Sequence, residues 1–98
     1  MLKISVVDGR NERRLVVEGK LVAPWAAEMK NACENAKADL GGRELVVDIR
    51  NLSVISQEGE NTLLGLMREG VTFRCCGVFT KEILKHVARR LHANGAHS

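Results

Sequence analysis

The sequence predicts an α/β fold in which three helices accompany a mixed, mostly parallel sheet, with the element order β-β-α-β-α-β-α. Near the N-terminus, two short apolar stretches lie close enough together to form a hairpin. After them, stretches with helical spacing alternate with strand-like stretches, which is typical of right-handed crossovers between parallel strands. The chain has 98 residues, of which 45% are hydrophobic, and this fits one compact core.

The hairpin is predicted from alternation and turn chemistry. Residues 2–7 alternate between apolar and other side chains at their start, which predicts a strand. Asp8 and Gly9 then favour a turn. A second apolar stretch, within residues 14–18, predicts a strand antiparallel to the first.

The first helix is predicted to begin at Pro24, because the missing N–H of proline costs nothing in a first turn. Apolar residues then recur at spacings of three and four, which indicates one buried helix face. They are Trp25, Met29, Cys33, Ala36 and Leu40. Gly41 and Gly42 are predicted to end the helix.

The next strand, over residues 45–49, is nearly all apolar and is predicted to be central or covered on both faces. Residues 50–57 are predicted to form a loop. A second helix is predicted over residues 58–69, with Gly70 as its C-terminal stop.

The C-terminal part is predicted to contain a strand over residues 71–77 and a third helix capped by Thr80. The inward face of that helix is predicted to consist of Ile83, Leu84, Val87, Ala88 and Leu91. Residues 94–98 are predicted to be a flexible tail. The organisation expected is one domain over residues 1–93.

Charge and composition exclude several function classes. The net charge is +3, and its basic residues include Arg10, Arg13 and Arg14, and also Lys81, Lys85, Arg89 and Arg90. They indicate either solvated faces or a footprint for an acidic partner. Nucleic acid is not expected as a partner, because no binding motif accompanies the charge and only Trp25, Phe73 and Phe79 are aromatic.

No apolar segment reaches the ~18 residues of a membrane span, so none is expected. Three cysteines, Cys33, Cys75 and Cys76, occur without a C-x-x-C spacing. This pattern favours reduced, buried thiols and a cytoplasmic location.

Catalytic and cofactor motifs are not found. His86, His92 and His97 do not pair with cysteines at a metal-ligand spacing. No glycine pattern of a phosphate-binding loop is present. We therefore expect no cofactor and no enzymatic activity. An enzyme remains the least favoured hypothesis and needs a hidden site in which His86 and Cys75 converge.

One segment is unusual, namely residues 53–59 between the most apolar strand and the second helix. In open α/β sheets, partners and anions bind where parallel strands end and helices begin. A purely structural alternative is that Ser56 caps the helix and Gly59 allows close packing.

The same region carries a family resemblance. Residues 45–49, then 54–59 and then Leu63 and Leu64 resemble the STAS domain of anti-sigma factor antagonists. Residues 15–21 and 71–77 are also similar to that family, and the likeness covers about residues 13–91. The resemblance implies a SpoIIAA-like mixed sheet with three helices. It also implies a surface for a kinase-type anti-sigma factor, which in the family phosphorylates one serine.

The sequence departs from the family at that serine. Matching Gly59 to the motif glycine places Glu58 at the phospho-acceptor, Gln57 at the other serine and Ser56 at the aspartate. Glu58 has no hydroxyl to phosphorylate, and its single charge is smaller than that of phosphoserine. The prediction is a fixed negative charge at the helix start, unless Ser53, Ser56 or Thr62 accepts phosphate instead. Because phosphorylation releases the partner in the family, such a domain either binds its partner without phosphorylation control or is held in a phosphorylated-like state.

The resemblance therefore implies a non-catalytic regulatory domain in bacterial transcription control. Its protein partner is expected to be an anti-sigma factor or related kinase, and a homodimer is conceivable. The implied partner-binding residues are Ser53, Ser56, Gln57, Glu58, Gly59, Asn61 and Thr62. The alternative is a STAS-like accessory subunit of a transport ATPase complex.

Overall fold

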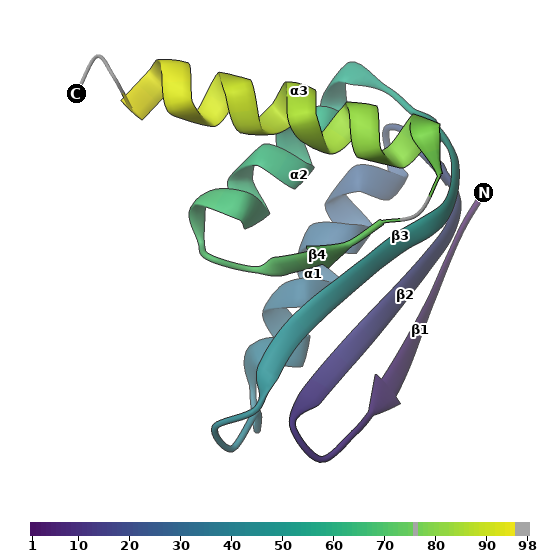
Figure 1. Cartoon of the computed structure of the whole chain (residues 1–98). Coiled ribbons are helices and arrows are strands. Elements are labelled where there is room, and N and C mark those ends of the chain that lie inside the picture. Colours follow the sequence, from purple (N-terminus) through teal and green to yellow (C-terminus); the bar gives the residue numbers. More distant parts are fainter. Residues whose placement is uncertain (76, 96–98) are drawn as a thin grey trace.

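The computed structural model describes residues 1–75 and 77–95. In this part of the chain, four strands form one sheet with the spatial order β1-β2-β3-β4. Strand β1 is antiparallel to β2, whereas β2 and β3, and also β3 and β4, are parallel. The predicted mixed, mostly parallel sheet and the order β-β-α-β-α-β-α are confirmed (Figure 1). The strand bounds are Leu2–Asp8, Glu12–Leu21, Glu44–Ile55 and Thr72–Arg74.

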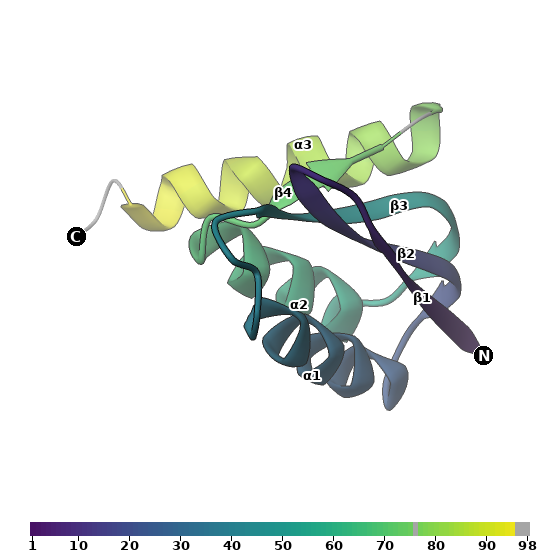
Figure 2. The same cartoon turned by 90° about the horizontal axis from the view of Figure 1, so that it is seen from below.

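The helices are α1 (Trp25–Lys37), α2 (Gln57–Arg68) and α3 (Val78–Gly95). Helices α1 and α2 lie side by side on the same side of the sheet (Figure 2). Helix α3 packs mainly on α2 and also contacts β3. We call the sheet face toward α1 and α2 the inner face, and the opposite face the outer face.

The core forms where the inner face meets the helices. Alternate side chains of the central strands point inward and are fully buried, as expected from the two-residue period of a strand. These are Leu15 and Val17 of β2, and Val47 and Ile49 of β3. Buried helix residues complete the core, namely Met29, Cys33, Leu63, Leu66 and Val87. On the predicted apolar face of α1, Trp25 and Leu40 are only partly buried.

Strand β3 is longer than predicted, because residues 50–55 were expected to form a loop. They continue the strand, and Val54 and Ile55 lie opposite Lys20 and Leu21 of β2. Strand β2 is itself longer than the predicted residues 14–18 and supplies this pairing. The polar side chains that suggested a loop lie at exposed positions, where a strand tolerates them.

The C-terminal elements also differ from the prediction. Strand β4 is only three residues long, and Cys75 follows it. Helix α3 begins at Val78, after Gly77, whose φ of +86° turns the chain. Thr80 is therefore buried inside the first turn and is not the cap.

Helix α3 also continues through residues 94 and 95, where a tail was predicted. Cys76 and residues 96–98, which include His97, lie outside the described residues. No described helix is both long and apolar enough to span a membrane.

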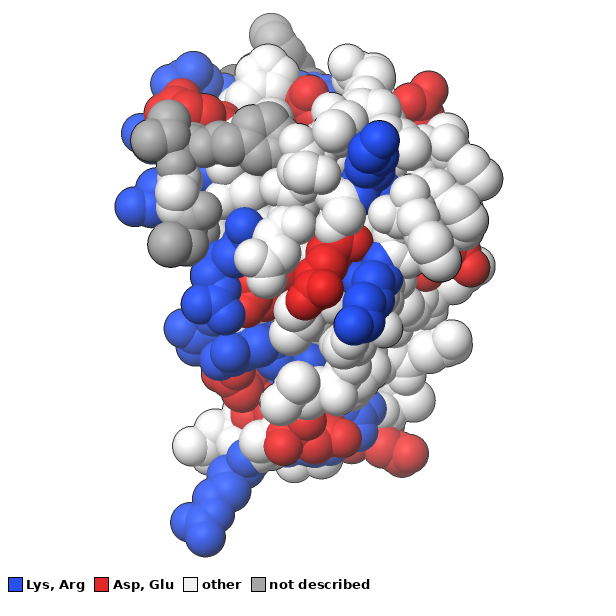
Figure 3. Space-filling view, turned by 90° about the vertical axis from the view of Figure 1, so that its right-hand side faces the viewer, with Lys and Arg blue, Asp and Glu red and all other residues white. Residues whose placement is uncertain are grey.

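The surface carries charges of both signs. Seen from the right-hand side of Figure 1, Lys and Arg side chains gather along one margin and uncharged residues cover much of the rest (Figure 3). Several of the predicted basic residues are held by internal contacts. Arg13, for example, donates to the Asp8 carboxylate at 2.7 Å and to the Ala36 carbonyl at 3.1 Å.

Helix α2 approaches the end of β2 very closely at Gly59. A Cβ atom at this position would lie 2.4 Å from the Leu21 carbonyl oxygen and 3.1 Å from Cγ2 of Ile55. By contrast, a Cβ at Gly65, six residues later in the same helix, would meet nothing within 4 Å. The predicted role of Gly59 in close packing is confirmed.

This contrast predicts opposite effects of two identical substitutions. Gly59→Ala should lower the free energy of unfolding by about 1–3 kcal/mol, because the added methyl group forces the backbones apart. Gly65→Ala should raise it by about 0.5–1 kcal/mol, since alanine is the better helix former. Urea unfolding of both variants measures this. Equal effects of the two substitutions would contradict the packing described here.

Candidate functional site

The candidate site lies where β3 ends and α2 begins. Of the segment predicted as a loop, only Ser56 lies between the two elements. Ser53 belongs to β3, whereas Gln57, Glu58 and Gly59 form the first turn of α2. The expected position at the carboxyl end of a parallel strand is therefore present, but the site is a strand end and a helix start rather than a loop.

Ser56 fixes the start of the helix. Its hydroxyl oxygen accepts a hydrogen bond from the Gly59 N–H at 3.2 Å, as expected of an N-cap. Its own N–H donates to the Leu21 carbonyl at 3.0 Å, which ties the cap to β2. The structural interpretation of Ser56 as a helix cap is confirmed.

The other polar residues of the site are mostly exposed and make local contacts. The Gln57 side chain donates to Oδ1 of Asn61 at 3.3 Å, and the Thr62 hydroxyl donates to the Glu58 carbonyl at 3.1 Å. The Ser53 hydroxyl donates to the Gly19 carbonyl at 3.1 Å. Among the described residues, the exposed Glu58 carboxylate makes no ion pair. It stands at the helix N-terminus, where the helix dipole favours negative charge.

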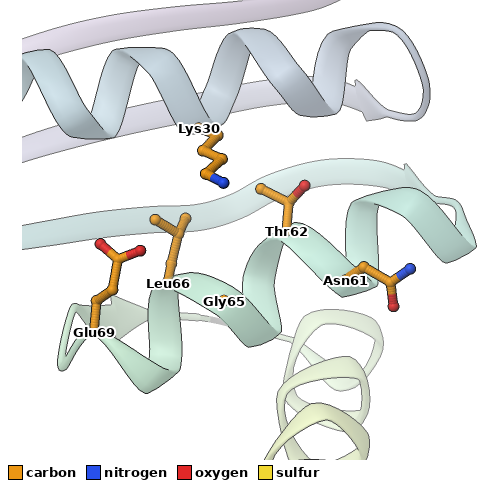
Figure 4. A pocket seen from close by; sticks show the side chains of 6 residues that line it. All are labelled: Lys30, Asn61, Thr62, Gly65, Leu66 and Glu69. Carbon is orange, nitrogen blue, oxygen red and sulfur yellow. The ribbon is translucent and has the colours of Figure 1, made fainter.

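A hollow of about 190 Å³ adjoins this site between α1 and α2 (Figure 4). Two of the predicted site residues, Asn61 and Thr62, line it, and the side chain of Lys30 extends toward it from α1. The other lining residues are Gly65, Leu66 and Glu69. Sequence reasoning missed Lys30, because only the packing of α1 beside α2 brings it to the site.

Helix α3 holds the opposite flank of α2. Nη2 of Arg90 donates to Oδ1 of Asn61 at 2.9 Å, so Asn61 is anchored. Nε2 of His86 lies 3.2 Å from Oε1 of Glu60, and Nη1 of Arg90 lies 3.7 Å from the same oxygen. These two contacts have ion-pair distances but not hydrogen-bond geometry, so they are weak.

The described residues include two of the three cysteines considered from the sequence. They contain no group of three or more His, Cys, Asp and Glu side chains that could hold a metal ion. Burial raises the pKa of the Cys33 thiol to about 11, so it stays protonated at neutral pH. Cys75 is a free, partly buried thiol beyond the end of β4.

The outer face carries a charged network that the sequence analysis did not single out. Asp48 is only 1% exposed and accepts hydrogen bonds from Nε of Arg50 at 2.9 and 3.0 Å. Burial alone would raise the pKa of Asp48. The hydrogen bonds from the side chain and N–H of Arg50, with the charges of Arg50 and Arg14, outweigh burial and lower that pKa.

Glu12 holds the second part of this network. It accepts hydrogen bonds from Nε of Arg14 at 3.0 Å and from Nη2 of Arg74 at 3.1 Å. The Arg14 bond is the chief cause of the lowered pKa of Glu12, and partial burial opposes it. In the sequence, only the two-residue period of the predicted strands could have indicated that these arginines share one face of the sheet.

Comparison with known proteins identifies the fold. No protein-family model matches the chain, and no curated protein matches it significantly. Among solved structures, it is similar to an uncharacterized protein with a SpoIIAA-like fold from Shewanella loihica PV-4. That match has a TM-score of 0.55 and 18% identity, and covers 81% of this chain and 71% of the other.

It is also similar to the STAS domain of an anti-sigma-factor antagonist from Rhodobacter sphaeroides. Here the TM-score is 0.52 and the identity 20%, with 78% of this chain and 86% of the other covered. The chain therefore has the SpoIIAA-like fold of STAS domains, as the resemblance implied.

The carboxylate–arginine contacts predict loss of stability in acid. The folded-state pKa values of Asp8, Glu12 and Asp48 lie below their ordinary values of 3.8 for Asp and 4.5 for Glu. The unfolded chain therefore binds more protons, and the stabilisation present at neutral pH is lost as the pH falls below about 5. Urea unfolding between pH 7 and pH 3 measures this. In Asp48→Asn, the free energy of unfolding should depend less on pH than in the wild type. The same pH dependence in both proteins would argue against an ionised Asp48.

The environment of Cys33 predicts that it resists alkylation. Native protein treated with iodoacetamide at pH 7.5 should remain unmodified at Cys33, because its thiol is buried and protonated. Cys75, which is partly exposed, should react first of these two. Peptide mass mapping before and after unfolding in urea gives the readout. Rapid labelling of Cys33 in the native protein would contradict its place in the core.

Proposed function

We propose that this chain is a non-catalytic, STAS-like regulatory domain that binds a protein partner such as an anti-sigma factor. The proposed surface comprises residues 53–59 and the following helix, α2. The SpoIIAA-like fold, which an anti-sigma-factor antagonist shares, supports this function. The observation that carries the proposal is the exposed Glu58 carboxylate at the start of α2, which makes no ion pair within the described residues. With such a partner, the chain would act in the bacterial cytoplasm.

Packing and hydrogen bonds fix the proposed surface to the rest of the fold. The Ser56 cap and the close approach at Gly59 fix the helix start against β2, and Arg90 anchors Asn61. A surface that is already ordered loses little conformational entropy when a partner binds. The hollow beside Asn61 and Thr62 offers a recess for a partner side chain, with Lys30 at its edge.

Binding without phosphorylation at the usual position is part of the proposal. If Gly59 corresponds to the motif glycine of the family, Glu58 takes the place of the phospho-acceptor and supplies one negative charge there. The nearby hydroxyls are engaged within the fold, because Ser56 caps α2 and Ser53 and Thr62 donate to backbone carbonyls. This supports a fixed charge rather than a phosphorylation switch at the helix start.

Charge reversal tests the surface. Glu58→Lys should weaken binding to a kinase-type anti-sigma factor of the source organism by about tenfold or more, because a contact charge is inverted. Isothermal titration calorimetry with the purified proteins measures the affinity. Glu28→Lys, an exposed position on α1, is the matched control and should change the affinity by less than about twofold. Equal effects of the two reversals would place the contact elsewhere.

Phosphorylation is tested separately. The wild-type chain, incubated with the anti-sigma factor and ATP, should gain no phosphate by intact mass, whereas Glu58→Ser should gain one. Stoichiometric phosphate on wild-type Ser53, Ser56 or Thr62 would overturn the fixed-charge proposal. If no anti-sigma factor binds and the chain copurifies with a transport ATPase, the accessory-subunit alternative replaces the regulatory role.

A further inference from the structure

The outer face of the sheet contains a concave, basic recess, here called the arginine hollow. It has a volume of about 530 Å³ and is lined by Arg14, Arg50, Phe73, Arg74 and Cys75. Its arginines come from β2, β3 and β4 in turn. The recess shares no lining residue with the hollow between α1 and α2. None of its lining residues lies in residues 53–59 or in α2, so the recess is separate from the proposed partner surface.

Strand register brings the three guanidinium groups together. Arg14 lies opposite Val46, and Arg74 lies opposite Asp48. Val46 and Asp48 are two residues apart, so their side chains share the outer face. The contact between the Arg50 side chain and the Asp48 carboxylate places Arg50 on the same face.

Two carboxylates, those of Asp48 and Glu12, accept hydrogen bonds from these arginines. The Asp48 side chain is 1% exposed, whereas those of its partner Arg50 and of Arg74 are 48% and 51% exposed. Glu12 lies between Arg14 and Arg74 and accepts from both. Asp48 is thus covered, whereas the Glu12 side chain remains 25% exposed between arginines that are 32% and 51% exposed. The three arginines line the recess. A guanidinium has five N–H donors, so Arg14 and Arg74 keep donor capacity beyond their bonds to Glu12.

We propose that the arginine hollow binds a phosphate group, either as free phosphate or as a phosphate ester. Three guanidinium groups against two carboxylates leave an excess of positive charge in the recess. A phosphate carries nearly two negative charges and three or more acceptor oxygens, so it can engage several guanidinium groups at once. Arginine presents the planar fork that suits such an anion, and the carboxylates beneath it hold that fork in place.

The test is an NMR titration of the whole chain at neutral pH and constant ionic strength. Inorganic phosphate should shift the Nε–Hε signals of Arg14, Arg50 and Arg74 along saturating curves, and chloride should not. A parallel titration with O-phosphoserine distinguishes the two sources. Tighter binding of O-phosphoserine points to a phosphate ester, and tighter binding of inorganic phosphate points to the free ion.

Variants establish the site. Arg74→Gln should weaken phosphate binding by about tenfold, because a charge-assisted hydrogen bond is lost. Arg74 is the arginine to replace, because its partner Glu12 retains the hydrogen bond from Arg14 and is not left without a cation. Arg89→Gln, at an exposed position of α3 that does not line the recess, removes the same charge and should leave the affinity unchanged. Arg74→Lys retains the charge without the fork and should weaken binding partly.

Three results would overturn the proposal. These are shifts that do not saturate with phosphate, equal shifts with chloride, and wild-type affinity in Arg74→Gln. The wild-type titration alone decides the first two, so the proposal remains testable even if a variant fails to fold. Loss of partner binding in Glu58→Lys has no bearing on it, because Glu58 does not line the recess.

Discussion

The contact between Gly59 and the Leu21 carbonyl sets the distance between helix α2 and the sheet. Because no side chain separates the two backbones, the start of α2 lies directly against the end of β2. Leu63 and Leu66 then enter the core one and two turns further along the helix. The Ser56 cap depends on the same approach, since its N–H donates to the Leu21 carbonyl. The inward side of α2 is buried in the core, and the cap occupies the helix start. Only the solvent-facing side of the first turn therefore remains accessible to another molecule.

The two faces of the sheet use different physical means to shield the central strand. On the inner face, aliphatic side chains of β2 and β3 are removed from water by α1 and α2, which supplies the main driving force for folding. On the outer face, Val46 is also fully buried, although long arginine side chains line that face. Their aliphatic stems can cover apolar surface while the charged ends stay in water. Because the arginine side chain is long, it can cover apolar surface with its stem and keep its charged end in water.

Much of the fold could be predicted from the sequence because its signals are local. The spacing of Met29 and Cys33 identified the buried face of α1, and the apolar run at residues 45–49 identified the central strand. The extent of β3 could not be predicted in this way. Residues 50–55 become a strand because β2 lies beside them, and that pairing is not encoded in their own polarity. The sequence also indicated that the candidate residues follow a strand end. Lys30 beside them, and the three arginines of the separate recess on the outer face, come from distant parts of the chain. Helix packing brings Lys30 to its position, and strand register brings the arginines together.

At the start of α2, two positions are constrained by the fold, and the two positions between them are not. Ser56 and Gly59 are constrained by the cap and by the carbonyl of Leu21, whereas Gln57 and Glu58 point to solvent. Exchanges at the exposed pair therefore carry little thermodynamic penalty. In evolutionary terms, position 58 is therefore free to exchange an acidic side chain for a hydroxyl side chain by a single amino-acid substitution. The architecture would carry either side chain without rearrangement, so the chemistry of this surface position can diverge among proteins of this shape faster than their scaffolds do.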